Sequence, residues 1–490
     1  MRLMRLGFQH SYFALPSRFY ARVSPTPVAH PRLVVFNHAL AADLGLQPTV
    51  IELAPAMFSG NQLPEDANPI AMAYAGHQFG GFVPRLGDGR AILIGELKGR
   101  DGVLRDIQLK GAGLTPFSRG GDGRAAVGPM LREYLISEAM NALGIPTTRS
   151  LAVVTTGEHV YRDRALAGAV LTRVAASHIR VGTFQYFAAQ ADHDALRVLL
   201  QYVIARHFPA VRDADSPALG VLQAVTQRQV ALITDWMLLG FIHGVMNTDN
   251  VAISGETIDY GPCAFMDEYD PKTVFSSIDQ TGRYAYANQP AIARWNLARF
   301  AETLLPLIDA NLEKAVSLVT DVVEPFITQV DTRFLEGMRR KIGLSSAMVG
   351  DAELIGNLLT TMQHSHADFT LTFRQLALAA GDPDEQPRVR ELFSTTAGID
   401  SWLKDWQLRL ARDPRSPGAR AASMRSANPA FIPRNHRVEA ALSAAEAGDY
   451  SAFHKLLEIL QRPYDDQPKM IEYAQPPQPS ERVLQTFCGT

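Results

Sequence analysis

Polar residues near the middle of the chain have the types and spacing of a metal-assisted phosphate site. The segment HGVMNTDN, residues 243–250, ends in Asp249 and Asn250, and the segment DYG starts shortly afterwards at Asp259. Asn250 and Asp259 supply hard oxygen atoms, which Mg²⁺ and similar ions prefer as ligands. A tight hairpin between them would let both side chains converge on one divalent cation that also binds nucleotide phosphates.

The two segments follow the order of a kinase-type catalytic centre, with one residue changed. Such centres carry H-x-D-x-x-x-x-N and then D-F-G, and the loop Asp orients the attacking hydroxyl. Val245 stands at that Asp position, and a new carboxylate, Asp249, stands directly before Asn250. The alternative reading of Asp249–Asn250 is a turn or helix cap. We expect His243 to bond the loop backbone and not to act as a base.

Composition indicates a globular protein with no strong electrostatic field. The 490 residues predict two or three packed units, and 47 basic residues against 50 acidic residues give a formal net charge of −3. This balance argues against nucleic acid or an anionic membrane as a partner. Neither a signal peptide nor a membrane span is evident, so a soluble cytoplasmic protein is expected. Two cysteines exclude a disulfide framework and a cysteine-rich zinc site.

The pattern of elements predicts an α+β fold with a protein-kinase-like bilobal arrangement. Residues 1–70 are expected to form an irregular extension that wraps the core, with one amphipathic stretch at 34–46. Residues 71–182 would form a small, mainly antiparallel lobe, with a glycine loop before strands at 91–97 and 103–110. A second glycine loop at 118–124, a helix at 129–143 and strands at 150–156 and 168–174 would complete it.

Helices dominate the rest of the predicted structure. Residues 183–400 would form a helical lobe, with broad apolar stripes at 194–208 and 227–242. Residues 401–490 would form a C-terminal extension, with a helical hairpin broken at Gly448 and an extended proline-rich tail that reaches Cys488.

Lys110 ends the second predicted strand, where a kinase fold places the lysine that neutralises nucleotide phosphates. A glutamate of the following helix would position this lysine. Helical periodicity places Glu138 inside the apolar stripe and Glu133 at its edge, so the pattern alone favours Glu138 as the buried acid. Further guanidinium groups near the glycine loops suit phosphate oxygens, although most of them could be ordinary surface residues. They are Arg90, Arg119, Arg124, Arg173 and Arg180.

Four long motifs resemble the selenoprotein O family. They are AYAGHQFGGFVPRLGDGRA, QLKGAGLTPFSRGGDGRA, HGVMNTDNV and DYGPCAFMD, and the likeness runs from SYFALPSRFYARV to the cysteine near the C-terminus. The resemblance implies a kinase-like fold long classed as a pseudokinase that acts as a protein adenylyltransferase. It would move AMP from ATP to Ser, Thr or Tyr hydroxyls of proteins and release pyrophosphate. The ATP would be bound in a flipped orientation, with Mg²⁺ or Mn²⁺.

The resemblance also implies a role for individual residues. Asp249 would be the proton acceptor, Asn250 and Asp259 would hold the metal, and Glu133 would support Lys110. The nucleotide contacts would be Gly87, Gly89, Arg90, Lys110, Asp122, Gly123, Arg173 and Arg180.

Cys488 occupies the position at which eukaryotic members of the family carry selenocysteine, and Cys263 follows the DYG segment. One hypothesis is a reversible Cys263–Cys488 disulfide that restricts the site, and the alternative is two unrelated thiols. Two other functions remain open at this point: a kinase-like phosphotransferase acting on a small molecule, and a non-catalytic nucleotide-binding pseudokinase. Labelled ATP separates them, because α-label, γ-label or neither would enter the acceptor.

Overall fold

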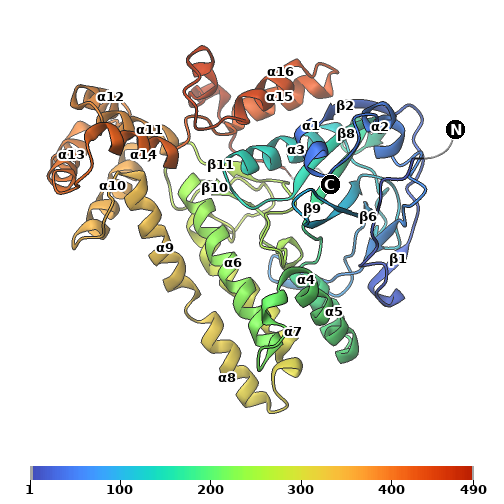
Figure 1. Ribbon diagram of the computed structural model, residues 1–490. Coiled ribbons are helices and arrows are strands. Elements are labelled where there is room, and N and C mark those ends of the chain that lie inside the picture. The colour runs from blue at the N-terminus through green and yellow to red at the C-terminus, as the bar shows by residue number, and fades with distance from the viewer. Residues whose placement is uncertain (1–3, 488–490) are drawn as a thin grey trace.

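The computed structural model describes residues 4–487 and confirms an α+β fold built around a seven-stranded antiparallel sheet (Figure 1). All pairs of neighbouring strands in this sheet run antiparallel. The strands, in spatial order, are β1 (Tyr20–Arg22), β3 (Ile70–Met72), β6 (Ala91–Lys98), β7 (Leu104–Lys110), β9 (Ala165–Ala175), β8 (Arg149–Tyr161) and β2 (Arg32–Phe36).

The central strands are those with the clearest apolar patterns in the sequence. The predicted strands at 91–97, 103–110, 150–156 and 168–174 are confirmed as β6, β7, β8 and β9, and the last two are longer than predicted. Alternate side chains of these strands enter two different hydrophobic clusters, because successive residues point to opposite faces of a sheet. Leu93 and Leu171 belong to the cluster that contains α3 (Val127–Ala142), whereas Ile92 and Val170 belong to the other.

The first seventy residues are more regular than predicted. They supply both edge strands, β1 and β2, and the helices α1 (His38–Asp43) and α2 (Val50–Phe58). The stretch at 34–46 is not one amphipathic helix, since its first residues form β2 against β8. Asn37 then caps α1 by accepting a hydrogen bond from the backbone N–H of Leu40. Helix periodicity missed this strand because the apolar run spans the end of a strand and the start of a helix.

Helix α3 is buried on more than one side. It packs against β8 and β9 and, in addition, against α15 (Asn435–Glu446) and α16 (Ser451–Leu460). It begins two residues before the predicted start and is followed by Gly144, whose φ of +83° suits a glycine after a helix. The predicted hairpin of α15 and α16 is confirmed, with Gly448 between them.

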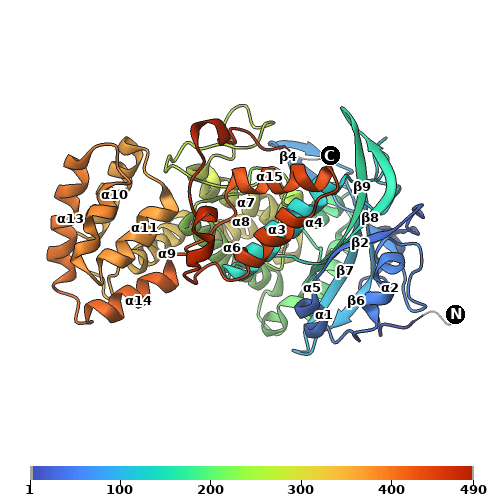
Figure 2. The ribbon, with the colours of Figure 1, turned by 90° about the horizontal axis from the view of Figure 1, so that it is seen from above.

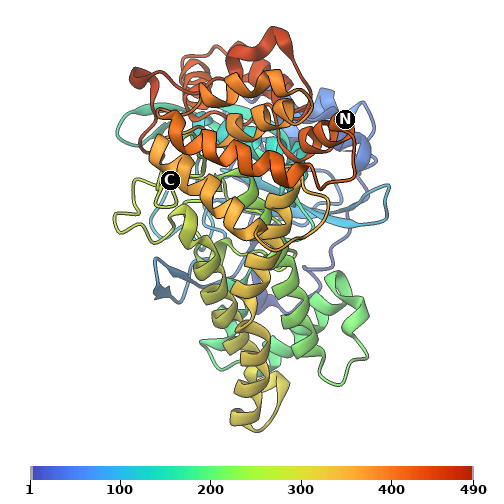
Figure 3. The same cartoon turned by 90° about the vertical axis from the view of Figure 1, so that its left-hand side faces the viewer.

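The middle of the chain is helical (Figure 3). Helix α6 packs against both α7 and α9 and is followed by Gly240, which has a φ of +71°. The predicted stripes at 194–208 and 227–242 fall in α5 and α6. The helices of this part are α4 (Val181–Ala188), α5 (His193–His207), α6 (Pro217–Leu239), α7 (Gln289–Ile308), α8 (Leu312–Val323) and α9 (Phe326–Lys341).

A further group of helices lies at the end of the molecule remote from the sheet (Figure 2). It comprises α10 (Asp351–Ser365), α11 (Phe369–Ala379), α12 (Gln386–Arg390), α13 (Thr396–Leu410) and α14 (Pro417–Ala427). After α16 the chain is interrupted by 3-10 turns at Pro468–Tyr473 and Pro479–Glu481, so the tail is less extended than predicted. No helix within residues 4–487 is both long and apolar enough to cross a membrane.

Candidate active site

The segment that carries Asp249 and Asn250 packs against the helical part of the molecule, where η3 (Thr248–Asn250) contacts α4 and β10 (Phe241–Ile242) contacts α6. The segment follows β10, which pairs with β11 (Ala264–Phe265), and it ends in η3, a 3-10 turn. The Nδ1 of His243 accepts a hydrogen bond from the backbone N–H of Val245 at 3.3 Å, and its Nε2 lies 3.0 Å from the backbone oxygen of Ile258. Burial lowers the pKa of its imidazole. The expectation that His243 bonds the loop backbone is therefore confirmed.

The expected tight hairpin between Asn250 and Asp259 is not present. Ala252 bridges to Arg180, and Thr257 bridges to Thr147, so the backbone of this stretch pairs with two other segments. These pairings occupy backbone N–H and C=O groups that a hairpin paired with itself would have needed. Asp259, which follows this stretch, bonds to Arg180 in the linker before α4 and to Lys110 and Arg173 in the sheet.

Three cations meet at the carboxylate of Asp259. Lys110 Nζ donates to its Oδ1 at 2.7 Å, Arg173 donates to the same oxygen at 2.6 Å, and Arg180 donates to Oδ2 at 3.0 Å. Burial alone would raise the pKa of Asp259, but the charges of these groups outweigh it and hold the pKa well below its usual range. Asp259 also has a φ of +65°, a conformation that residues other than glycine rarely adopt.

Glu133, and not Glu138, pairs with Lys110. Glu133 Oε2 accepts a hydrogen bond from Lys110 Nζ at 2.5 Å, and its Oε1 accepts one from Arg173 at 3.1 Å. Glu138 instead accepts hydrogen bonds from Arg149 and from the backbone N–H of Ser150. Glu138 is buried, as the pattern predicts, but Glu133 is buried as well, because α3 is covered on more than one side, and Glu133 is the partner of Lys110 that the family resemblance implies.

Two buried residues that the sequence reading missed support the same cluster. Gln108 lies opposite Arg173 in the β7–β9 ladder and accepts a hydrogen bond from it at 2.6 Å. Asp88 accepts hydrogen bonds from the side chain of Gln108 and from the backbone of Met72, and lies 3.8 Å from Arg180. A signal for Gln108 was present, since it lies two residues before Lys110 and so shares a face of the strand with it.

Asp249 has a very different environment. It is buried, its Oδ2 accepts one hydrogen bond from Gln78 at 3.3 Å, and its Oδ1 has no hydrogen-bond partner within residues 4–487. Burial raises the pKa of this carboxyl to about 6, and the nearby charge of Arg180 only partly opposes that effect. Asp249 is thus a desolvated carboxylate with an acceptor oxygen to spare.

Asn250 and Asp259 have the donor chemistry for a divalent cation. Asn250 donates from its Nδ2 to the backbone oxygen of Val245 at 3.0 Å, so its Oδ1 is the atom that could serve as a metal ligand. The described part of the chain contains no group of three or more His, Cys, Asp or Glu side chains that could hold a metal by themselves. An ion bound here would need further oxygen ligands, and nucleotide phosphates can supply them.

The two glycine loops pack against each other beside the cation cluster. A Cβ on Gly87 would lie 2.2 Å from the ring of Phe117, and one on Gly89 would lie 3.0 Å from the backbone oxygen of Phe117. Ser118 also donates a hydrogen bond to the backbone oxygen of Gly89 at 2.5 Å. Arg90 follows directly and leads into β6. Both positions therefore need glycine for close packing of the first loop on the second.

The second glycine loop lies outside the hydrogen-bonded cluster at Asp259. Asp122 is exposed and forms an ion pair with Arg162 at 2.8 Å, while Gly123 packs on the backbone of Gly113. Arg124 donates to the backbone oxygens of Thr26 and Pro27, which is a structural role. Two of the arginines singled out in the sequence, Arg173 and Arg180, bond directly to Asp259.

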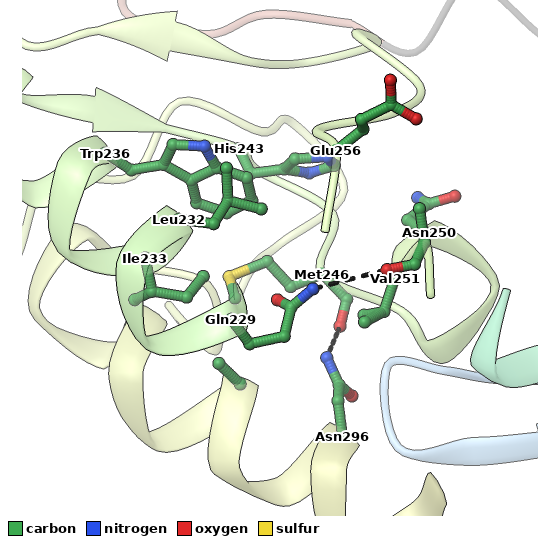
Figure 4. Close-up of a pocket in the computed structure, with 12 residues that line it drawn as sticks. Gln229, Leu232, Ile233, Trp236, His243, Met246, Asn250, Val251, Glu256 and Asn296 are labelled. Carbon is green, nitrogen blue, oxygen red and sulfur yellow. Dashed lines mark hydrogen bonds between the residues drawn. The ribbon is translucent and has the colours of Figure 1, made fainter. Parts of the chain in front are cut away.

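A small cavity lies beside the loop of residues 243–250 and is lined in part by Trp236, Met246 and Asn296 (Figure 4). Its volume of about 10 Å³ is close to the space for one water molecule. Asn296 donates from Nδ2 to the backbone oxygen of Met246 at 3.0 Å. The cavity is therefore a packing detail of the loop and is too small to hold a nucleotide.

The last described residues lie along the segment that follows Asp259. Thr486 donates from its Oγ1 to the backbone oxygen of Pro262 at 2.6 Å, and its backbone pairs with that of Ser276. Cys263, next to Pro262, is buried. The hypothesis of a Cys263–Cys488 disulfide concerns Cys488, which lies outside the described residues.

Comparisons with known proteins agree with the sequence motifs. The family described as "Protein adenylyltransferase SelO" matches residues 2–461. The chain is 60% identical over 487 residues to "Protein nucleotidyltransferase YdiU" of Rhizobium rhizogenes, which covers 99% of this chain and 97% of that protein. Proteins of the same name from Rhizobium meliloti and Bradyrhizobium sp. (strain BTAi1) are 59% and 60% identical, and each alignment covers 99% of both chains.

These matches first define the class of protein: an enzyme, as the sequence motifs predict. More specifically, the chain belongs to the SelO family of protein adenylyltransferases. The predicted resemblance to the selenoprotein O family is thereby confirmed over nearly the whole chain. Membership of a family of enzymes also goes against the alternative of a non-catalytic pseudokinase.

Proposed function

We propose that this protein transfers AMP from ATP to Ser, Thr or Tyr hydroxyls of other proteins. The observation that carries the proposal is the pairing of two unlike carboxylates in one site. Asp259 is surrounded by Lys110, Arg173 and Arg180, whereas the buried Asp249 has an oxygen without a partner in the described structure. The first arrangement suits phosphate and metal binding, and the second suits acceptance of a proton.

The acceptor hydroxyl oxygen attacks the α-phosphorus of ATP in this proposal. A new oxygen–phosphorus bond forms, the bond from the α-phosphorus to the oxygen that bridges it to the β-phosphate breaks, and pyrophosphate leaves. Asp249 takes the proton of the hydroxyl, for which its Oδ1 is available. General-base help of this kind typically contributes ~10² to 10⁴ in rate.

Cations of the cluster stabilise the charge that develops on the α-phosphate and on the leaving pyrophosphate. Lys110 and Arg173 are held in place by Glu133, and Arg180 by its bond to the backbone oxygen of Asp249. Asn250 and Asp259 would hold Mg²⁺ or Mn²⁺, which neutralises phosphate charge when bound. The nucleotide would further contact Gly87, Gly89, Arg90, Asp122 and Gly123.

A flipped orientation of ATP is part of the proposal. It would bring the α-phosphorus, instead of the γ-phosphorus, to the acceptor. Val245 stands where a kinase carries its loop Asp, so a proton acceptor is needed elsewhere, and Asp249 is the buried carboxylate of the same loop. We also propose that the sheet with α3 and the helices from α4 onward correspond to the two lobes of a protein-kinase-like fold.

ATP labelled at either the α- or the γ-phosphate tests this function. The purified protein is incubated with a protein acceptor and Mg²⁺ or Mn²⁺, and label in the acceptor is counted after denaturing electrophoresis. Transfer of the α-label with release of the γ-label in pyrophosphate is expected. Transfer of the γ-label would support a phosphotransferase instead, and transfer of neither label would refute both.

A further inference from the structure

A separate β-hairpin covers the loop that carries Asp249. It is formed by β4 (Gly76–Gln78) and β5 (Gly81–Val83), which pair only with each other and not with the seven-stranded sheet. Strand β4 is visible apart from the main sheet in Figure 2. This hairpin belongs to the first glycine-rich segment, so that segment contacts the loop that carries Asp249 as well as the second glycine loop.

Three hydrogen bonds join the hairpin to the loop of residues 243–250, and in each of them a loop side chain is the acceptor. The backbone N–H of His77 donates to Thr248 Oγ1 at 2.7 Å, and that of Phe79 donates to Asn247 Oδ1 at 3.0 Å. Gln78, between them, donates from its Nε2 to Asp249 Oδ2 at 3.3 Å. Three successive residues of the hairpin therefore bond three successive residues of the loop.

The contact with Asp249 is unusually close because of a glycine. A Cβ on Gly76 would lie 2.6 Å from Asp249 Oδ1, closer than real Cβ contacts. The backbone of β4 thus limits where this oxygen can go, while Gln78 holds the other oxygen. Together they fix the plane of a carboxylate that has no other side-chain partner within the described residues.

Backbone strain at the tip is consistent with a hairpin that is built for this contact. Phe79 has a φ of +50°, which an aromatic residue rarely adopts and which costs about 1 kcal/mol or more. Its ring packs at 5.1 Å from that of Tyr284, whose hydroxyl donates to the same Asn247 oxygen. These contacts hold the turn in a conformation that its sequence does not favour, and they keep Gln78 over Asp249.

We propose that Gln78 is a positioning residue for AMP transfer. By donating to Oδ2 it fixes the orientation of the Asp249 carboxylate that takes the proton of the acceptor hydroxyl, and it acts through Asp249 without touching the nucleotide. The inference rests on the proposed function. In this proposal the hairpin helps Asp249 to activate the acceptor hydroxyl, whereas the glycine loops that follow it bind ATP.

Steady-state kinetics of Gln78→Ala and Gln78→Glu test this role. The acceptor is one synthetic peptide, taken from a set that contains Ser, Thr or Tyr as the one that wild type labels fastest with α-labelled ATP. Gln78→Ala should lower kcat about 10-fold, because a hydrogen bond to a charged group is lost, with the KM for ATP within about 2-fold of wild type. Gln78→Glu should be slower still, since it places a second carboxylate beside that of Asp249.

Val83→Thr, in the other strand of the same hairpin, is the matched control and should retain the wild-type kcat. A thermal midpoint for each variant separates misfolding from a kinetic effect. Wild-type kcat in Gln78→Ala, an increase in the KM for ATP alone, or a Gln78→Glu variant as active as Gln78→Ala would overturn the inference. Failure of wild type to transfer α-label would instead refute the proposed function, and it would appear before any variant is compared.

Discussion

Asp259 and Asp249 lie in one site, yet their surroundings differ in almost every respect. Asp259 accepts hydrogen bonds from Lys110, Arg173 and Arg180, and their charges keep its pKa well below the usual range. Asp249 is bonded by the neutral side chain of Gln78, and burial raises its pKa to about 6. Within the described residues, the carboxylate of Asp259 accepts hydrogen bonds from three charged side chains, whereas that of Asp249 accepts one from a neutral side chain.

In the proposed function, this contrast divides two tasks between two carboxylates. A carboxylate that holds cations in a fixed array stabilises phosphate charge without reorganising during the reaction. A desolvated carboxylate with a spare acceptor oxygen costs stability but is a better proton acceptor. The distinction follows from the neighbours of each residue, since the two side chains are chemically identical.

Asp259→Ala should have the largest effect. It removes the carboxylate ligand and leaves the cluster of positive charges without its central partner, so transfer of AMP should fall by ~10³ or more. Calorimetric titration with ATP should no longer show tighter binding when Mg²⁺ is added. Metal-dependent ATP affinity equal to that of wild type would remove Asp259 from the metal site.

Asp249→Asn should lower transfer by ~10² to 10⁴ while ATP affinity in the presence of Mg²⁺ stays within about 3-fold of wild type. The same change should leave the thermal midpoint unchanged or raise it, because a buried charge with few partners is replaced by a neutral amide of the same shape. A large loss of stability would show that the Asp249 carboxylate is better compensated than its contacts indicate.

Glu133→Gln and Glu138→Gln compare two buried carboxylates of the same helix, α3. Glu133→Gln should reduce kcat/KM for ATP by ~10- to 100-fold, because Lys110 and Arg173 lose a charged partner that holds them in place. Glu138→Gln should leave kcat/KM unchanged and cost about 1 to 3 kcal/mol of unfolding free energy, since it weakens bonds to Arg149. The reverse order of kinetic effects would reassign the lysine partner.

Asp122→Ala should have the smallest effect, a change of about 2- to 5-fold in the KM for ATP. Asp122 is exposed and its ion pair with Arg162 lies outside the cluster, so its proposed contact with the nucleotide is screened by solvent and contributes less than the buried groups do. Arg162→Ala should then have an effect of similar size. A loss comparable to that of Asp259→Ala would show that Asp122 contributes as much to nucleotide or metal binding as the buried cluster does.

Local sequence signals predicted the scaffold of the site better than its contacts. Alternation and turn residues predicted β6 and β7, and an apolar period ending at Gly144 predicted α3, because these elements depend on neighbours along the chain. The same period misassigned Glu133, since it assumes one buried face while α3 packs against the sheet and against α15 and α16. That second layer comes from residues some 300 positions away.

Contacts made by short or irregular segments could not be predicted in this way. The hairpin of β4 and β5 lies in a glycine-rich stretch with no apolar period, and its position over η3 depends on side chains such as Thr248 and Asn247. The pairing of residues 251–258 with two separate segments has the same origin. Such segments find their partners only once the surrounding elements have packed.

Mass spectrometry of the acceptor provides the most direct test of the two-carboxylate account. A protein acceptor is incubated with ATP and Mg²⁺ and with either wild type or Asp249→Asn, at ATP concentrations that saturate both enzymes, and modified peptides are sequenced. The account predicts an adenylyl group on a Ser, Thr or Tyr hydroxyl with wild type and a near-complete loss of it with Asp249→Asn. A phosphoryl group on the acceptor, or equal adenylylation by the two enzymes, would contradict it.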